Sequence, residues 1–304
     1  MLYSELQCSE AIHKAVERMG FAEMTEIQEK TIPLMLAGHD VIAKAPTGTG
    51  KTCAFGIPVV EHIQPENKYP QAVIMAPTRE LAQQIAEELT NLTYFMPEVQ
   101  VACVYGGANM EKQAKRLAEG CQIVVATPGR LMDHYKHHSI DISHVTQIVL
   151  DEADEMLNMG FTESIDAILA GVPAERNTLL FSATMGKEIE RIAKSYLHDY
   201  KEIVVGSRNE GAEKVNHIYY LVHAKDKYVA LKRVVDYYPR IYGIIFCRTR
   251  IETQEVADQL IRDGYNAEAL HGDLSQAQRD LTMQKFRQHH TQLLVATDVA
   301  ARGL

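Results

Sequence analysis

Apolar residues recur along the chain at two different spacings, and the alternation of these spacings predicts the fold. Apolar positions three and four residues apart predict helices over 10–19, from a cap at Thr25 to Leu36, and over 81–92. Short continuous apolar runs between them predict strands buried on both faces. These runs lie at 41–44, 72–76, 99–104, 123–126, 148–150, 178–181 and 203–205. Such an alternation is typical of a parallel sheet covered by helices on both sides, so an α/β fold is expected.

Polar residues interrupt this pattern once, and it then resumes. Residues 206–215 are rich in Gly, Ser, Arg, Asn and Glu, which predicts a linker between two domains. After the linker, strands are expected at 218–222, 241–246, 267–270 and 292–296, and helices at 253–262 and 276–287. The region 216–304 is shorter than the about 100–150 residues of a typical domain. We therefore expect two parallel-sheet α/β domains in tandem, the second of them incomplete.

The composition is that of a folded protein without a membrane segment. Apolar residues make up 46% and charged residues 23% of the 304 positions, which are ordinary globular values. No apolar run reaches the about 18–20 residues of a membrane span, and no signal segment is recognised, so a cytoplasmic location is expected. The five cysteines show no disulfide or zinc spacing. The histidines, including 137–138 and 289–290, lack ligand spacing and are expected on the solvated surface.

The net charge of −9 argues against a protein that coats nucleic acid non-specifically. It does not exclude a narrow site in which a few arginines and backbone N–H groups contact phosphates. A nucleic-acid partner therefore has to be argued from local motifs.

A glycine-rich loop between an expected strand and an expected helix is the first chemical motif. It consists of Ala45, Pro46, Thr47, Gly48, Thr49, Gly50, Lys51 and Thr52. Strand, glycine loop and helix in this order are typical of a phosphate-binding loop, although Ala45 stands where the general pattern has its first glycine. Lys51 would face the β and γ phosphates and the Thr52 hydroxyl would bind Mg²⁺. A Gly-Lys-Thr tripeptide also occurs in ordinary turns, but this context favours a nucleoside triphosphate.

Adjacent carboxylates at the end of an expected strand form the second motif. Asp151 and Glu152 follow the run 148–150 and precede Asp154. Asp151 would hold Mg²⁺ through water, and Glu152 would orient or deprotonate the attacking water. The alternative is an acidic helix N-terminus stabilised by the helix dipole. The glycine loop earlier in the chain favours a catalytic and metal-binding role.

Together these motifs resemble those of the DEAD-box RNA helicases of superfamily 2, and the resemblance runs nearly from end to end. Further matching segments are Gly20-Phe21 through Gln28, Pro77-Thr78-Arg79-Glu80-Leu81-Ala82, Gly106-Gly107, Thr127-Pro128-Gly129-Arg130, Ser182-Ala183-Thr184, Phe246-Cys247-Arg248-Thr249, Gln276 to Arg279, and Ala296-Thr297-Asp298 through Arg302-Gly303. The resemblance implies two RecA-like domains. Their expected bounds are 1–31 for the Q-motif region, 32–205 for the ATP-binding helicase domain, 206–215 for the linker and 216–304 for the helicase C-terminal domain.

The resemblance also implies roles for individual residues. ATP binding is expected at the loop and at Tyr3, Phe21, Gln28 and Asp298. Coupling of hydrolysis to unwinding is expected at Asp154, Ser182 and Thr184. Contacts with the RNA backbone are expected at Pro77, Thr78, Arg79, Gly107, Thr127, Arg130, Thr249, Arg279 and Thr297. A glutamine amide offers a donor and an acceptor that match the edge of adenine, so Gln28 would select ATP over GTP. The alternative for Gln28 is a solvated helix start. Taken alone, the Thr-Arg and Thr-Pro-Gly-Arg motifs are more often helix caps or turns.

The expected activity is ATP- and Mg²⁺-dependent local unwinding of short RNA duplexes through sequence-independent backbone contacts. Two alternatives stay open: a DNA translocase with the same core, and a clamp that closes on RNA without productive turnover. The family's arginine-finger motif does not occur within the 304 residues. Since such an arginine is worth about 10³–10⁵ in rate in related motors, hydrolysis by this chain is expected to be impaired.

Overall fold

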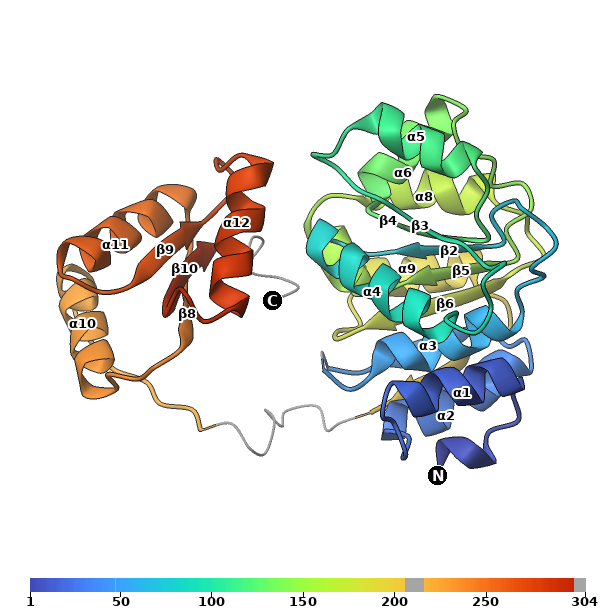
Figure 1. The fold of residues 1–304 in the computed structure, drawn as a ribbon, viewed down its shortest axis with the longest axis horizontal. Coiled ribbons are helices and arrows are strands. Elements are labelled where there is room, and N and C mark those ends of the chain that lie inside the picture. Colours follow the sequence, from blue (N-terminus) through green and yellow to red (C-terminus); the bar gives the residue numbers. More distant parts are fainter. Residues whose placement is uncertain (47, 206–215, 298–304) are drawn as a thin grey trace. The chain divides into compact units, whose positions relative to one another are not determined.

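The computed structural model describes residues 1–304 except 47, 206–215 and 298–304 (Figure 1). The chain divides into two compact units, Met1–Arg208 and Asn209–Leu304, called unit 1 and unit 2. The expected linker, Thr47 and Asp298 lie outside the described residues. Each unit is described by itself.

Unit 1 is built around one parallel sheet. Its strands are β1 (Val41–Lys44), β2 (Ala72–Met75), β3 (Val101–Val104), β4 (Ile123–Ala126), β5 (Gln147–Leu150), β6 (Asn177–Ser182) and β7 (Lys201–Val204). Its helices are the 3₁₀ turn η1 (Tyr3–Glu5), α1 (Glu10–Arg18), α2 (Glu26–Leu36), α3 (Lys51–Glu61), α4 (Arg79–Leu92), α5 (Met110–Ala118), α6 (Pro128–Lys136), α7 (Ala153–Asn158), α8 (Thr162–Gly171) and α9 (Lys187–Tyr196). The strand order is β3-β4-β2-β5-β6-β1-β7, with parallel pairing throughout.

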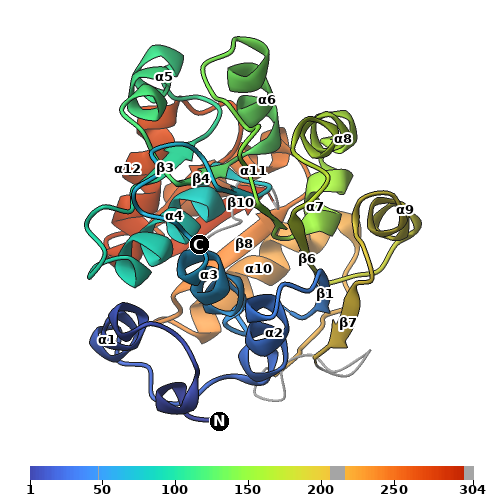
Figure 2. The same ribbon diagram turned by 90° about the vertical axis from the view of Figure 1, so that its right-hand side faces the viewer.

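The continuous apolar runs are explained by two cores, one on each face of this sheet. Successive side chains of a strand point to opposite faces. Val41 and Ala43 therefore join the core under α1–α4, whereas Ile42 joins the core under α5, α6, α8 and α9. Figures 1 and 2 show these two groups of helices on opposite sides of the sheet. Right-handed crossovers account for the division, because the chain moves one way across the sheet through α3 and α4 and then returns.

The strand order divides the carboxyl edge of the sheet into two halves. β5, β6 and β1 are neighbours, and so are β3, β4 and β2. The glycine loop follows β1, the acidic motif follows β5, and Ser182 ends β6. The segments after β2, β3 and β4 carry the expected RNA motifs. Ligands bind at the carboxyl ends of strands in open α/β sheets, so both candidate sites lie on the expected edge.

Unit 2 has a smaller parallel sheet. Its strands are β8 (Gly243–Cys247), β9 (Ala267–Leu270) and β10 (Leu293–Thr297), in the order β8-β10-β9. Its helices are the 3₁₀ turn η2 (Ala224–Asp226), α10 (Lys227–Tyr237), α11 (Arg250–Arg262) and α12 (Gln276–Arg287). Apolar residues of α10 and α11 pack on one face of the sheet, and those of α12 pack on the other.

The strand predicted at 218–222 is wrong. This segment has no regular secondary structure, and the side chains of Tyr219 and Leu221 are 91% and 99% exposed. A strand is stable only when its backbone groups pair with a neighbour, and none of the described strands pairs with this segment. The expected α/β class with parallel sheets is confirmed. In the described parts of both units, no helix combines the length and apolar character needed to cross a membrane.

Candidate nucleotide site and nucleic-acid interface

The loop between β1 and α3 has the backbone conformation of a phosphate cradle. Gly48 and Gly50 have φ values of 81° and 85°, in the left-handed region that side chains disfavour. Gly50 is also the N-cap of α3, where backbone N–H groups are available to an anion. Ala45 is fully buried and its N–H donates to Ser182 O at 3.2 Å, so a residue with a Cβ fits this position. Pro46 is exposed, and Thr49 Oγ1 donates to Pro46 O at 2.9 Å.

Lys51 and Asp151 meet at the buried end of this loop. The Lys51 Nζ atom lies 3.8 Å from Asp151 Oδ1, and both side chains are buried. Among the described residues, Nζ has no hydrogen-bond partner. Burial raises the pKa of Asp151 to about 6, against the opposing effect of the Lys51 charge. A buried ammonium without a hydrogen bond is costly unless a ligand pairs with it, which fits a bound phosphate. Thr52, the next residue of α3, is half-buried and offers a hydroxyl for Mg²⁺.

The second residue of the acidic motif has a strained backbone. Glu152 has a φ of 50° and caps α7, and its N–H donates to Asp151 Oδ1 at 2.9 Å. Positive φ in a glutamate costs about 1–2 kcal/mol and is typical of functional turns. This turn lies at the residue that is expected to orient or deprotonate the attacking water.

Asp154 connects the acidic motif to the end of β6. Its Oδ2 atom accepts hydrogen bonds from Thr184 N at 2.9 Å and Thr184 Oγ1 at 2.8 Å. Ser182 Oγ donates to Thr184 O at 2.6 Å. The three residues expected to couple hydrolysis to unwinding are therefore in direct contact.

Gln28 on α2 contacts the glycine loop rather than solvent. Its Nε2 atom donates to Gly50 O at 3.0 Å, and its Oε1 atom accepts from Thr25 N at 2.8 Å and Tyr3 Oη at 2.7 Å. Thr25 Oγ1 adds a 2.8 Å hydrogen bond to Thr49 O. The reading of Gln28 as a solvated helix start is thus wrong, because only 4% of the residue is exposed.

The two aromatic candidates differ in accessibility. Tyr3 is buried and its hydroxyl is held by Gln28, whereas Phe21 is 44% exposed and stacks on Tyr3 with a ring separation of 6.4 Å. Burial raises the pKa of Tyr3, so its hydroxyl stays a donor. Phe21 is therefore the aromatic that offers a free face to a base.

The expected RNA motifs of unit 1 follow three adjacent strands. Thr78 caps α4 and accepts from Leu81 N at 3.3 Å, while Thr127 caps α6. Gly107, in the exposed turn after β3, has a φ of 82°. Pro77 and Thr127 are buried, so their contribution to an interface is to position the backbone.

Two arginines face this half of the edge. The Arg79 guanidinium lies over the Tyr105 ring at 5.1 Å, and Gln83 Nε2 donates to the Tyr105 hydroxyl at 3.0 Å. Arg130 Nη1 donates to Ala108 O at 2.9 Å, and Arg130 Nε lies 3.7 Å from Asp133 Oδ2. Guanidinium groups and turn N–H groups on one edge suit the oxygens of a phosphate backbone.

The unit 2 candidates lie at the carboxyl edge of the smaller sheet. Thr249 follows β8 and caps α11, accepting from Glu252 N at 3.1 Å. Thr297 ends β10 and pairs in register with Cys247. Arg279 lies in the first turn of α12, directly after the loop that leaves β9.

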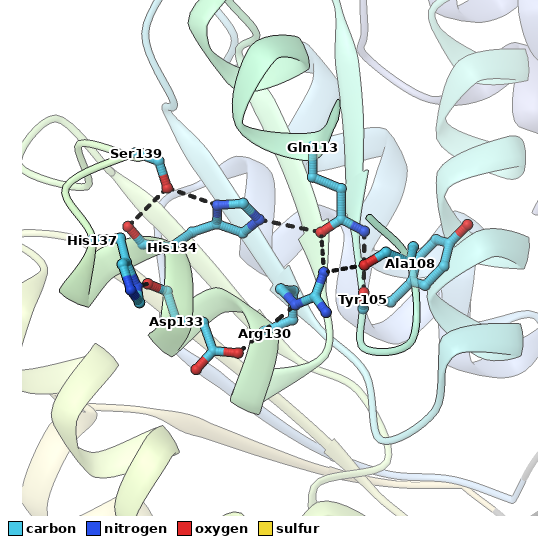
Figure 3. Close-up of polar contacts among 8 residues, drawn as sticks. All are labelled: Tyr105, Ala108, Gln113, Arg130, Asp133, His134, His137 and Ser139. Carbon is cyan, nitrogen blue, oxygen red and sulfur yellow. Dashed lines mark hydrogen bonds and ion pairs between the residues drawn. The ribbon is translucent and has the colours of Figure 1, made fainter. Parts of the chain in front are cut away.

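Sequence reasoning missed Gln113 and His134, which form one hydrogen-bonded group with Arg130 (Figure 3). Both are buried and hydrogen-bonded to each other at 3.2 Å. The residues are 21 positions apart and belong to different helices, so no local spacing reveals the pair. The expectation of solvated histidines holds for 137–138 and 289–290, but is wrong for His134 and His271, whose polar atoms are satisfied inside the fold.

Comparison with known families decides among the readings of this site. The sequence profile of the DEAD/DEAH box helicases matches residues 25–192, more than half of the chain. The chain belongs to the DEAD-box helicase family. The profile of the helicase conserved C-terminal domain matches residues 226–304, which supports the second domain of a DEAD-box protein.

Named relatives of this DEAD-box chain align along almost its whole length. It is 48% identical to the DEAD-box ATP-dependent RNA helicase CshA of Geobacillus kaustophilus, over 99% of this chain and 64% of that protein. It is 42% identical to the ATP-dependent RNA helicase DeaD of Escherichia coli, over 99% of this chain and 48% of that protein. The chain thus spans between about half and two thirds of the length of these relatives.

Solved structures agree with the family. A DEAD box protein from Methanococcus jannaschii matches with a TM-score of 0.64 and 39% identity, over all of this chain and 82% of the other. A variant of Saccharomyces cerevisiae Dbp5 bound to Gle1 and IP6 matches with a TM-score of 0.76 and 26% identity, over all of this chain and 76% of the other. These likenesses identify the fold as that of DEAD-box proteins.

Proposed function

We propose that the protein is an ATP-dependent RNA helicase that binds the RNA backbone and separates short duplexes locally. The proposal rests on family membership, on the names of the relatives as RNA helicases, and on the two candidate sites along one sheet edge of unit 1. A cytoplasmic location, expected from the sequence, is part of the proposal.

ATP with Mg²⁺ fits the half of the edge formed by β5, β6 and β1. Lys51 would neutralise the β and γ phosphates, and the loop N–H groups would bind their oxygens. Thr52 and Asp151 would hold Mg²⁺, which supplies charge stabilisation at the phosphates when bound. Glu152 would accept a proton from the attacking water or orient it. Gln28, together with Phe21, would recognise the adenine base.

RNA fits the half formed by β3, β4 and β2. Arg79, Arg130 and the turn at Gly107 would contact phosphate oxygens, which gives affinity without sequence preference. The bonds of Asp154 to Thr184 link the acidic motif to the end of β6, the strand between the glycine loop and the acidic motif. We infer that this link passes the nucleotide state to the rest of the edge.

The observation that carries the proposal is the buried Lys51 ammonium, which has no hydrogen-bond partner among the described residues at the mouth of the glycine loop. Lys51→Ala should weaken binding of a fluorescent ATP analogue by about tenfold to a hundredfold, the loss of a charged hydrogen bond. Glu152→Gln should bind as the parent does, because it removes the base and keeps the shape.

Lys30→Ala is the matched control, since it removes an exposed cation of α2 that pairs with Glu26. Its affinity for the analogue should equal that of the parent. Equal affinities for the parent, Lys51→Ala and Glu152→Gln would refute the nucleotide site.

RNA is favoured over DNA by the names of the relatives. The ATPase rate should therefore rise with a single-stranded RNA and not with a DNA of the same sequence. Equal stimulation by both strands would favour a DNA translocase. The same assay reports whether turnover by the 304-residue chain is as slow as the sequence leads us to expect.

A further inference from the structure

A single buried amide connects the parts of the candidate RNA interface. Gln113, on α5, is 8% exposed. Its Oε1 atom accepts from Arg130 Nη1 at 3.0 Å and lies 3.2 Å from His134 Nε2, while its Nε2 atom donates to Tyr105 O at 3.1 Å (Figure 3). The amide therefore contacts both Arg130 and the start of the turn that carries Gly107.

The hydrogen-bond partners place a proton on Nε2 of His134. Arg130 can only donate and Tyr105 O can only accept, so the orientation of the Gln113 amide has one solution. His134 Nε2 must then carry the proton that is donated to Gln113 Oε1. His134 Nδ1 lies 2.7 Å from Ser139 Oγ, whose hydroxyl donates to His134 O at 3.1 Å. Burial, followed by the charge of Arg130, lowers the pKa of His134, which agrees with this neutral tautomer.

The network leaves a defined part of Arg130 for a ligand. Its Nη1 atom is committed to Ala108 O and Gln113 Oε1, and its Nε atom faces Asp133. Among the described residues, Nη2 makes no hydrogen bond. A guanidinium that is hydrogen-bonded at Nη1, ion-paired at Nε and open at Nη2 is preorganised for one phosphate oxygen.

We propose that Gln113 and His134 are positioning residues that orient Arg130 and the 105–108 turn for one phosphate of a bound RNA strand. The inference rests on the proposed RNA function of Arg130. His134 holds the amide in one orientation, the amide holds the guanidinium, and Arg130 holds the turn through Ala108 O. Arg130 and His134 lie one turn apart on α6, whereas Gln113 comes from α5, so the order does not arise from one helix alone.

The test measures the affinity of the full chain for a fluorescein-labelled oligouridine strand by anisotropy, with Mg²⁺ and a non-hydrolysable ATP analogue present. Gln113→Leu and His134→Phe should each weaken RNA binding by about 3–10-fold, the cost of ordering a released side chain. His134→Gln, whose amide can still donate to Gln113, should restore most of the affinity. Affinity for a fluorescent ATP analogue should stay at the parent value in all three variants.

Arg130→Ala separates the RNA contact of Arg130 from the positioning role of Gln113 and His134. In that background Gln113→Leu should have no further effect, because the amide acts through the guanidinium. His137→Ala is the matched control at the end of α6, since the His137 side chain is exposed and contacts Asp133 O rather than Gln113 or Arg130. It should leave RNA affinity unchanged.

Each contrary result has a distinct meaning. If Arg130→Ala binds RNA as the parent does, the proposed contact of Arg130 is wrong and this inference falls with it. If Arg130→Ala weakens binding but Gln113→Leu and His134→Phe do not, the positioning role alone is wrong. A parallel loss of ATP-analogue affinity, or effects of Gln113→Leu and Arg130→Ala that add, would show a general structural role instead. Should Gln113→Leu fail to fold, the RNA affinities of His134→Phe and His134→Gln test the positioning role in its place.

Discussion

The two units contain strands of similar apolar character that are buried to different extents. In unit 1, β2, β4 and β5 are buried at every position, and Phe181 of β6 has no exposed surface. In unit 2, only the final residue of β8 is buried, and Phe246 is 58% exposed. The sheet position explains the difference, because β8 is an edge strand whereas β2, β4 and β5 each have two neighbours. An apolar run in the sequence thus predicts a strand, but its neighbours determine its burial.

The centre of unit 2 supports this explanation. β10 lies between β8 and β9, and its first four residues are buried. The difference in burial therefore separates central strands from edge strands, more than it separates the sequences of the two units. Three predictions test how far the contrast extends, beginning with the largest expected effect.

The first prediction compares two phenylalanines on strands. Phe181→Ala should lower the free energy of unfolding of unit 1 by about 3–5 kcal/mol, because it leaves a cavity beside Phe55. Phe246→Ala should change the stability of unit 2 by less than about 0.5 kcal/mol, as for an exposed substitution. Urea unfolding followed by far-ultraviolet circular dichroism measures both. Equal losses would mean that the exposed face of β8 is covered in solution.

The second prediction compares two aspartates whose pKa values move in opposite directions. Burial raises the pKa of Asp151 to about 6, so the folded protein binds a proton that the unfolded chain releases near 3.8. Stability should therefore fall as the pH rises from about 4 to 6. The unfolding free energy of Asp151→Asn relative to the parent should increase over this pH range. The increase should be about 3 kcal/mol, since each unit of pKa shift corresponds to 1.36 kcal/mol.

Asp263 in unit 2 is the control of opposite sign. Its hydrogen bond to Lys232 lowers the pKa of this exposed carboxylate. The stabilisation from this hydrogen bond should be present at neutral pH and disappear on acidification. Asp263→Asn should therefore approach the parent in stability as the pH falls. The same trend with pH for both variants would show that burial does not dominate at Asp151.

The third prediction compares two tyrosine hydroxyls. Tyr3→Phe removes a buried bond to Gln28 and should cost about 0.5–1.5 kcal/mol of unfolding free energy. Tyr242→Phe removes the bond to Phe286 O in unit 2, where Tyr242 is 43% exposed, and should cost less because water can replace the hydroxyl. Tyr3→Phe should also change the preference for ATP over GTP, since it frees one lone pair of Gln28. An unchanged preference for ATP over GTP in Tyr3→Phe would show that Tyr3 has no part in base recognition.

The fold class could be predicted from the sequence, and candidate residues for a nucleotide site could be named, for physical reasons. Buried parallel strands must be apolar on both faces, and a phosphate loop needs glycine, lysine and a hydroxyl in a fixed local order. Lys51 and Thr52 therefore become candidates from their neighbouring residues alone. The order of the strands is not local, so the proximity of Lys51 and Asp151 was inferred from the type of the two motifs and from the family resemblance, and not from sequence neighbours.

Two parts of the structure could not be predicted, because they depend on distant partners. The segment 218–222 has the apolar character of a strand but pairs with none of the described strands. Gln113 and His134 are ordinary polar residues of two helices until α5 and α6 bring them together. Polar pairs of this kind leave no periodic signal, whereas an apolar face does.

Gly50 has a consequence for how mutational tolerance should be interpreted. Its φ of 85° disfavours any side chain, and a Cβ there would lie 2.5 Å from Gln28 Nε2. Its carbonyl also accepts the hydrogen bond from that same amide. A survey of substitutions would record position 50 as one intolerant site. Two independent requirements act there, the positive φ and the absence of a side chain next to Gln28. A shorter residue at position 28 would remove the clash but not the strain of the positive φ. A second substitution at Gln28 should therefore not rescue a variant of Gly50.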